Sequence, residues 1–153
     1  MKTLVLYDSA FGNTEQIARS IGRAITGDVE VLRIGECNPS TLESLDFLFV
    51  GSPTQAGKPT LAMRDFLNKV PEAALKKRRV AAFDTRLSGK LVGIFGYAAG
   101  KIANDLESKG AALASSPEGF FVNGKEGPLK EGELERAALW AKETVRILSP
   151  AKA

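Results

Sequence analysis

Residues 3–18 read TLVLYDSAFGNTEQIA, and they carry two different hydrophobic periodicities in succession. The segment from Thr3 to Tyr7 is an almost unbroken apolar run, which is typical of a strand buried on both faces. After a short polar loop, Ile17, Ala18 and Ile21 recur at the spacing of one helix face. A buried strand that leads directly into an amphipathic helix is the repeating unit of α/β folds.

The rest of the chain repeats this alternation. Further strands are predicted at residues 29–34, 47–50 and 80–83, and a last one begins near Ala111, is interrupted at residues 115–117 and resumes at 120–122. The helices between them end near Gly27, Pro71 and Gly110, and a final helix runs to Leu148. With right-handed crossovers, this order predicts one domain over residues 1–153: a doubly wound five-stranded parallel sheet of order 2-1-3-4-5 between two helical layers.

The composition excludes several kinds of chemistry. The 153 residues are 44% hydrophobic and 25% charged, as in an ordinary globular domain. There is no histidine and one cysteine, Cys37, which excludes a His/Cys zinc site, an internal disulfide and a His-based triad. Cys37 follows the second strand and is interpreted as a structural thiol. We expect no metal.

The net charge is small, at +3 from 21 basic and 18 acidic residues. The one dense basic run, Lys76 to Arg79, is interpreted as the solvated end of a helix, so no nucleic-acid partner is expected. No apolar run approaches the length of a membrane span and no charged-then-apolar leader precedes Thr3. We therefore expect no membrane association and a cytoplasmic location.

The topology predicts where a ligand would bind. In doubly wound sheets, ligands lie outside the carboxyl ends of the strands, where the strand order reverses. The loops that follow Tyr7, Val50 and Phe83 are therefore the candidate site.

The first of these loops is suited to an anion. Its small and hydroxyl residues allow main-chain N–H groups to converge, Gly12 permits a positive φ, and the helix N-terminus adds a partial positive charge. Ser9 and Thr14 can add hydroxyl donors, so a phosphate could be held without Lys or Arg. The alternative is purely structural: Asn13 caps the helix and Gln16 completes a capping box.

The segment from Tyr7 to Ala18, YDSAFGNTEQIA, resembles the phosphate loop of flavodoxins, where Ser/Thr-x-Thr-Gly-x-Thr holds the phosphate of FMN. Ser9, Gly12 and Thr14 match this pattern, and Phe11 replaces its middle Thr. The resemblance extends over the whole chain in strand order and loop lengths. It implies a flavodoxin-like three-layer sandwich that binds FMN and transfers electrons between a reductase and an acceptor, both redox partner proteins.

The same resemblance assigns the other two loops to the flavin ring. Residues 51–60, GSPTQAGKPT, would present main-chain groups to one side of the ring, and residues 83–87, FDTRL, would present theirs to the other. We expect no catalytic side chain. The predicted cofactor-binding residues are Ser9, Ala10, Phe11, Gly12, Asn13, Thr14, Pro53, Thr54, Gln55, Ala56, Gly57, Asp84, Thr85 and Arg86.

Two features depart from typical flavodoxins. The segments from Ser52 to Gly57 and from Asp84 to Leu87 contain no aromatic residue to stack on the flavin, although Phe95 or Tyr97 could reach over it from the glycine-rich segment that follows. The ring loops are also rich in cations, namely Lys58, Arg64, Arg86 and Lys90, against the single carboxylate of Asp84. Because cations near the ring favour an anionic reduced flavin, this basic rim predicts a raised reduction potential and departs from the family's acidic docking face.

Two other functions remain open at this point. The first is an FMN-dependent NAD(P)H or quinone reductase, which would need a further pocket for the hydride donor. The second is an interaction domain of the same fold without flavin. A phospho-receiver domain fits poorly, because Gly51 and Ser52 occupy the position of its phosphorylated Asp.

Overall fold

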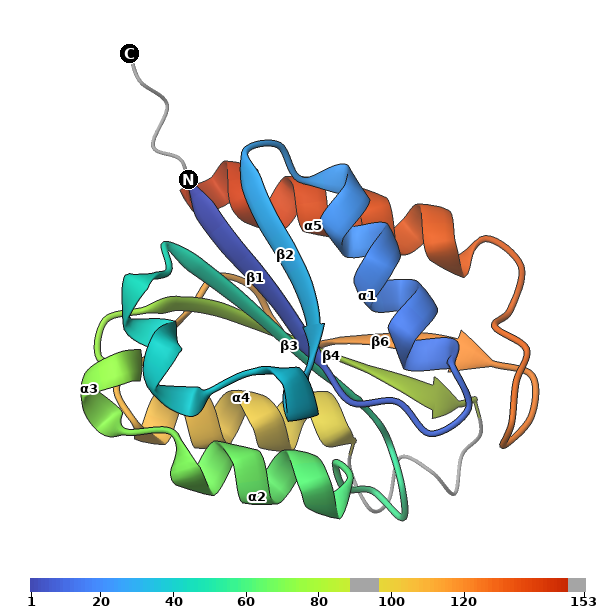
Figure 1. Ribbon diagram of the computed structural model, residues 1–153. Helices are drawn as coiled ribbons and strands as arrows, with labels where there is room; N and C mark the ends of the chain where they lie inside the picture. The colour runs from blue at the N-terminus through green and yellow to red at the C-terminus, as the bar shows by residue number, and fades with distance from the viewer. Residues whose placement is uncertain (89–96, 149–153) are drawn as a thin grey trace.

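The computed structural model describes residues 1–88 and 97–148, without the side chains of residues 147 and 148. Among them, parallel strands form one sheet in the order β2-β1-β3-β4-β5, and β6 also pairs with β4. Helices cover both faces of the sheet (Figure 1). The predicted doubly wound sandwich is confirmed.

The strands lie close to the predicted positions. Their bounds are β1 (Lys2–Tyr7), β2 (Asp28–Arg33), β3 (Phe47–Pro53), β4 (Arg79–Leu87), β5 (Ala112–Leu113) and β6 (Glu118–Val122). Both β5 and β6 pair with β4, the first beside residues 79–80 and the second beside residues 83–87. The interrupted last strand of the sequence prediction is therefore two short strands that share one edge.

The helices alternate with the strands. Their bounds are α1 (Asn13–Ala24), α2 (Leu61–Lys69), α3 (Glu72–Leu75), α4 (Ala98–Ser108) and α5 (Glu133–Leu148), with 3₁₀ turns η1 (Ile34–Glu36) and η2 (Pro39–Ser44). The predicted stop at Pro71 is confirmed, although the short α3 that follows it was not predicted. Gly89, Gly93, Gly96, Phe95 and Lys90 lie outside the described residues, as does the side chain of Leu148.

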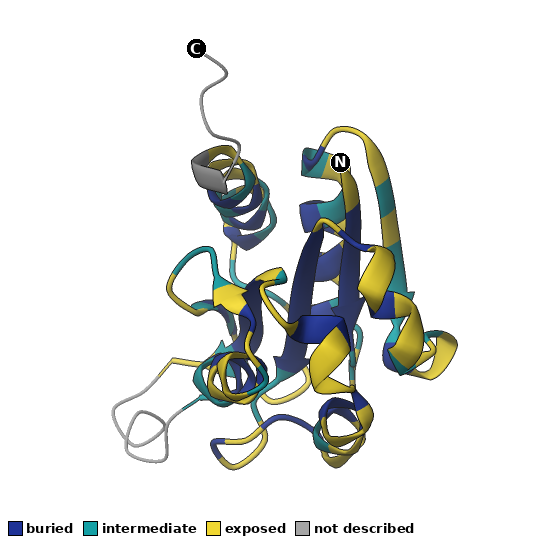
Figure 2. Cartoon of the chain, turned by 90° about the vertical axis from the view of Figure 1, so that its left-hand side faces the viewer, coloured by how far each residue is buried: buried dark blue, intermediate teal, exposed yellow. Residues whose placement is uncertain are grey.

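Two apolar cores hold the layers together. Helices α1 and α5 lie on one face of the sheet, and α2, α3 and α4 lie on the other (Figure 1). The strands are buried between helices whose outer faces are exposed (Figure 2). In the α1–α5 layer, Trp140 packs edge-on against Phe49, Phe83 and Phe120. Gly51 of β3 lies against the Phe83 ring, and a Cβ there would meet ring carbons at 2.1 Å.

Two predicted boundaries were wrong. Strand β3 continues through Pro53, and β4 continues through Leu87, so Asp84, Thr85 and Arg86 are strand residues and not loop residues. The cause is tertiary, because β6 supplies main-chain partners for residues 83–87. No described helix is both long enough and apolar enough to cross a membrane.

Candidate functional site

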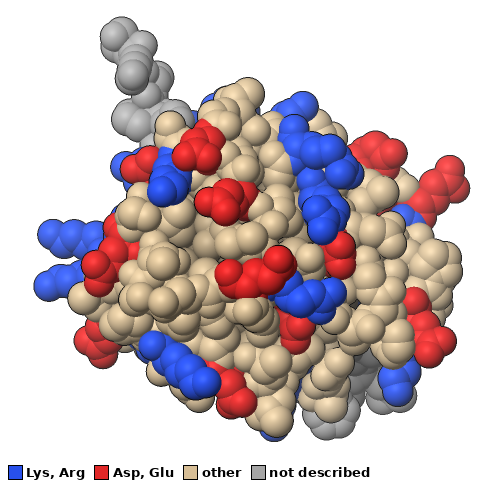
Figure 3. All heavy atoms as spheres, in the orientation of Figure 1, with Lys and Arg blue, Asp and Glu red and all other residues tan. Residues whose placement is uncertain are grey.

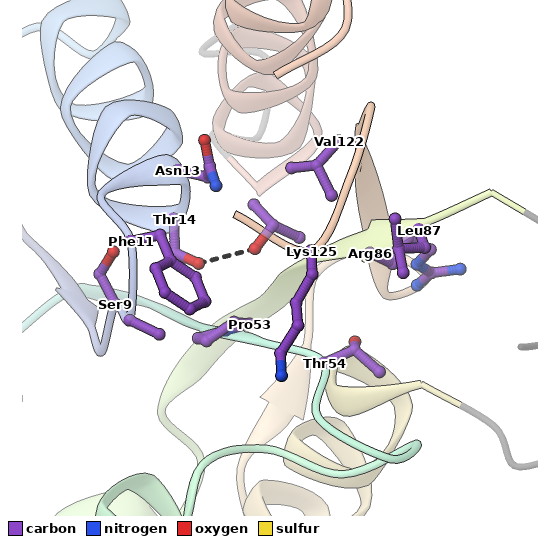
Figure 4. Close-up of a pocket in the computed structure, with 12 residues that line it drawn as sticks. Ser9, Phe11, Asn13, Thr14, Pro53, Thr54, Arg86, Leu87, Val122 and Lys125 are labelled. Atoms are coloured by element: carbon purple, nitrogen blue, oxygen red, sulfur yellow. Dashed lines mark hydrogen bonds between the residues drawn. The ribbon is translucent and has the colours of Figure 1, made fainter. Parts of the chain in front are cut away.

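The carboxyl ends of β1, β3 and β4 meet at one edge of the sheet, where two cavities adjoin. The smaller one, of about 70 Å³, lies at the start of α1, and we call it the phosphate cavity. The larger one, of about 840 Å³, lies over the segment after β3, and we call it the ring cavity. Their shared lining residues join them into one site (Figure 4): Ala10, Phe11, Pro53, Thr54, Leu87 and Lys125.

The start of α1 is open to a ligand. Gly12 is the N-cap, with φ of 92°, and no side chain caps the helix. The capping role considered for Asn13 is therefore wrong. Within the described residues, the main-chain N–H groups of Ala10, Phe11, Asn13, Thr14 and Glu15 have no hydrogen-bond partner. Unpaired amides at the positive end of a helix form an anion site.

Two hydroxyl groups stand beside these amides. Ser9 Oγ accepts from the Gly12 N–H at 3.0 Å, which shapes the loop and leaves its own hydrogen to donate. Thr14 Oγ1 lies 2.7 Å from Thr85 Oγ1, in the hydrogen bond drawn in Figure 4. With Thr85 as the donor, the Thr14 hydroxyl hydrogen is available to a phosphate oxygen.

The phosphate loop is fixed from outside by side chains that do not line it. Arg33 donates to the Ser9 carbonyl at 3.0 Å and pairs with Asp8 at 3.5 Å. Asp8 in turn accepts from the hydroxyl of Thr60, the N-cap residue of α2. Arg33 therefore holds the loop in place and does not bind a ligand.

Asn13 has a different role from the one considered in the sequence. Its side-chain amide donates to the carbonyl of Glu126 at 3.1 Å, 113 residues along the chain. This contact joins the start of α1 to the segment between β6 and α5. That segment carries Lys125, whose side chain extends toward Pro53 and Thr54 in Figure 4.

The segment after β3 forms one wall of the ring cavity. The main chains of Gln55 and Lys58 exchange hydrogen bonds of 2.8 and 3.0 Å, and Ala56 and Gly57 between them have φ of 50° and 78°. Positive φ at both central residues is the geometry of a type I′ turn. Thr54 fixes this turn to the sheet through its N–H, which donates to the Thr85 carbonyl at 2.8 Å.

Asp84 is fully buried and lines neither cavity. Its carboxylate accepts from Arg86 at 2.7 and 2.8 Å and from the Ala99 N–H at 2.9 Å. Burial raises the pKa of Asp84, and the hydrogen bonds and charge of Arg86 oppose that rise. The Arg86 guanidinium also stacks on the Tyr97 ring, 3.5 Å from its centroid. Arg86 is thus a paired cation, and Tyr97 is engaged with it.

The cations around the ring cavity differ from those predicted for the basic rim. Arg86 is neutralised by Asp84, and Lys90 lies outside the described residues. The cations that line the ring cavity are Lys58, Arg64 and Lys125, and none of their side chains has a hydrogen-bond or ion-pair partner within the described structure. The Arg64 Nε is a buried donor without a partner, and such atoms are costly unless a ligand satisfies them. No described carboxylate lines either cavity.

Phe11 is the aromatic residue closest to the junction of the two cavities. It lines both, is 50% exposed, and its ring lies beside Pro53 in Figure 4. In the sequence, Phe11 is the residue that replaces the middle Thr of the phosphate-loop pattern. The structure shows that the substitution also places an aromatic ring at the entrance of the ring cavity.

The family described as Flavodoxin matches residues 5–140. The chain belongs to the flavodoxin family. No curated protein matches the chain in sequence. Among solved structures, an archaeal flavodoxin is 23% identical, with 97% of this chain and 99% of that chain covered and a TM-score of 0.80.

Two bacterial flavodoxins are also similar to this chain. Oxidised flavodoxin 2 of Bacillus cereus is 22% identical over 95% of this chain and 99% of its own, with a TM-score of 0.80. The two-electron reduced flavodoxin of Megasphaera elsdenii is 23% identical over 92% and 98%, with a TM-score of 0.70. At these identities the structures support the fold, and the family match confirms FMN as the family's cofactor.

The flavodoxin site described above fits FMN in three ways. The uncapped helix start offers unpaired donors for a phosphate, the adjoining cavity is large enough for a ring system, and the buried Arg64 Nε has no other partner. Within the described residues, no cluster of His, Cys, Asp and Glu could hold a metal ion. Cys37 lies away from both cavities, and burial raises the pKa of its thiol.

Three lining residues are absent from the predicted binding residues, namely Leu87, Val122 and Lys125, although Leu87 lies in the segment 83–87 that was assigned to the ring. A usable signal existed for the last two. The rule that ligands lie at the carboxyl ends of strands applies equally to the segment after β6, where Gly124 and Gly127 flank Lys125.

Proposed function

We propose that this flavodoxin-family protein binds FMN in the two adjoining cavities and carries electrons between a donor and an acceptor protein. The observation that carries the proposal is the start of α1, where five main-chain N–H groups and two hydroxyls surround a cavity that opens into the ring cavity. When bound, FMN supplies all of the redox chemistry, because its ring accepts and releases electrons.

The residues of this chain would then bind and orient the cofactor. The unpaired amides of Ala10, Phe11, Asn13, Thr14 and Glu15, with the hydroxyls of Ser9 and Thr14, would hold the phosphate. Residues 53–57 would lie along the ring, and Phe11 would add an apolar contact at the junction. Asp84 would act indirectly, because its contacts with Arg86 and the Ala99 N–H fix the end of β4 and the start of α4, whereas Arg86 itself lines the phosphate cavity. We also propose a cytoplasmic location.

The relatives support reversible redox chemistry at this fold. Flavodoxin 2 of Bacillus cereus is described in its oxidised state and the Megasphaera elsdenii flavodoxin in its two-electron reduced state. For this chain we propose the same two end states of bound FMN.

The visible spectrum of the purified protein, with the released chromophore identified, tests the proposal. We expect stoichiometric FMN, or stoichiometric uptake of added FMN, and complete bleaching by dithionite. A protein that stays colourless and takes up no added FMN would instead be the flavin-free interaction domain.

The same preparation separates a carrier from an FMN-dependent reductase. A reductase would oxidise NADH or NADPH continuously with a quinone acceptor, whereas a carrier loaded with FMN would not. Sustained turnover in this assay would overturn the carrier proposal and leave FMN binding intact.

A further inference from the structure

Exposed apolar side chains gather around the ring cavity. Large hydrophobic residues that are exposed in the described structure include Phe11 at 50%, Leu61 at 63% and Leu87 at 39%. Phe11 and Leu87 line the ring cavity, and Leu61 begins α2, directly after the lining residue Pro59 and the N-cap Thr60. Large apolar groups that are exposed together mark interaction sites more often than chance.

The same entrance carries unpaired cations. Lys58, Arg64 and Lys125 line the ring cavity and have no hydrogen-bond or ion-pair partner among the described residues. Leu61 and Arg64 lie three residues apart on α2, which places them on the same side of the helix. We call the six residues Phe11, Leu61, Leu87, Lys58, Arg64 and Lys125 the entrance patch.

All the charged side chains of the entrance patch are basic. On the face shown in Figure 3, Lys and Arg are interspersed with Asp and Glu. Three arginines elsewhere are paired with carboxylates: Arg19 with Glu15, Arg33 with Asp8 and Glu15, and Arg136 with Glu118 and Glu133. Glu126 follows Lys125 in sequence but lines neither cavity. The cations of the entrance patch, unlike these three arginines, have no carboxylate partner among the described residues.

We propose that the entrance patch is the docking surface for an acidic redox protein. The inference rests on the proposed function, because the ring cavity is where electrons would enter and leave. Unpaired cations around an apolar centre steer an oppositely charged partner and orient it, while the apolar groups exclude water at contact. Electron-transfer encounters are small interfaces, and a patch of this size is suited to one.

An acidic protein fits this surface better than a small anion. The cavities that could take a nucleotide are those assigned to FMN itself. Leu61 lies outside them, and Phe11 and Leu87, which line them, are still 50% and 39% exposed. A protein partner would cover both the cations and the apolar groups, whereas a free nucleotide would contact the cations alone.

The test uses the FMN-loaded, ¹⁵N-labelled full chain and two probe proteins, an acidic [2Fe–2S] ferredoxin and basic cytochrome c, both oxidised. Amide shifts map the binding surface at low and high salt. We expect the ferredoxin to shift amides of the entrance patch, with affinity falling at least roughly tenfold from about 20 to about 300 mM salt. We expect no such shifts with cytochrome c.

Two pairs of variants test whether ferredoxin binding depends on the entrance patch. Lys58→Glu and Leu61→Ser should each weaken ferredoxin binding at least about fivefold. Their matched controls lie on α5, Lys142→Glu for the charge and Leu139→Ser for the apolar side chain, which is 60% exposed against 63% for Leu61. Both controls should bind the ferredoxin like the unchanged protein.

The remaining outcomes overturn the proposal. These are shifts on another face, equal binding of both probe proteins, no ferredoxin binding, or equal losses in the α5 controls. Tighter binding of short duplex DNA than of the ferredoxin would also overturn it, as would self-association through the patch. Failure to bind FMN would overturn the proposed function instead, and the same shift mapping on the FMN-free protein would then decide the docking surface separately.

Discussion

The phosphate end of the candidate site is built mainly from main-chain groups, whereas the ring end is built from side chains brought together from distant segments. At the phosphate end, residues 9–15 supply five unpaired amides and two hydroxyls within one local stretch. At the ring end, Phe11, Arg64 and Lys125 come from three separate parts of the chain. The first end presents mainly neutral donors, with Arg86 paired to Asp84 and Lys125 shared between the two ends, and the second presents full positive charges.

This difference separates two properties of the bound cofactor. Donors fixed in the main chain should decide which ligand binds, because they recognise a phosphate by geometry. Cations around the ring should decide how easily the ligand is reduced, because they stabilise added negative charge. Substitutions at the two ends should therefore change different measurements.

Thr14→Val should give the largest single effect, at the phosphate end. It removes one hydrogen bond to a charged group, worth about 1.5–3 kcal/mol, so the Kd for FMN should rise by about one to two decades. Riboflavin, which lacks the phosphate, should bind as before. Calorimetric titration with both ligands measures this.

Ser20→Ala is the matched control for Thr14. Ser20 is also a buried hydroxyl on α1, but it donates to the Leu134 carbonyl at 2.7 Å and lines neither cavity. Its loss should leave both affinities unchanged. If Thr14→Val weakens the binding of FMN and riboflavin equally, Thr14 does not bind the phosphate.

Phe11→Thr should change binding at both ends, because Phe11 lies at their junction. The new hydroxyl adds a possible phosphate donor, so the preference for FMN over riboflavin should increase about tenfold. The lost ring contact should weaken riboflavin binding. Unchanged riboflavin affinity would show that Phe11 does not touch the ring.

Lys125→Gln should affect the ring end. With the cation removed, the reduced flavin should be less stable, and the reduction potential should fall by on the order of tens of millivolts. The preference for FMN over riboflavin should stay the same. Spectroelectrochemistry measures the potential, with Lys142→Gln on α5 as the control. A selective loss of FMN affinity would instead assign Lys125 to the phosphate.

Glu133 gives the smallest expected effect. Arg136 lowers its pKa below the usual 4.5, aided by the Phe121 N–H, which donates to Glu133 at 2.7 Å and so joins α5 to β6. Because the folded pKa lies below the unfolded one, this contact stabilises the fold above about pH 4.5 and is lost as the pH falls through the folded pKa.

Glu133→Gln should therefore cost about 0.5–1 kcal/mol at neutral pH, since Arg136 is partly exposed, and less in acid. Urea unfolding at about pH 7 and about pH 3.5 measures this difference. The preference for FMN over riboflavin should not change, because Glu133 supports the scaffold and not the phosphate loop. The same cost at both pH values would show that the ionised carboxylate is not what stabilises the segment.

The phosphate end could be predicted from sequence because it is local. The strand, loop and helix of residues 3–18 follow from hydrophobic periodicity and one glycine, and the structure places them as expected. The role of Asn13 could not be predicted, because its partner, the Glu126 carbonyl, is set by tertiary packing.

The ring end was predicted less well, because it too depends on tertiary packing. Pairing of β4 with β6 extends β4 through Leu87, and this puts Asp84 and Arg86 on one side of a strand, where they form an ion pair. The two-residue spacing of Asp84 and Arg86 is visible in the sequence. It predicts an ion pair only if both residues belong to a strand, because side chains two residues apart lie on the same side of a strand. Lys125 reaches the site from the segment after β6, which no local pattern connected with the ring cavity.

Amide ¹H–¹⁵N shifts during titration with FMN and with riboflavin test the central claim most directly. If main-chain donors hold the phosphate, the amide protons of residues 10–15 should move strongly downfield with FMN and very little with riboflavin. Indistinguishable shifts with the two ligands, or FMN-specific changes confined to cationic side chains such as Arg33 or Lys125, would contradict the account.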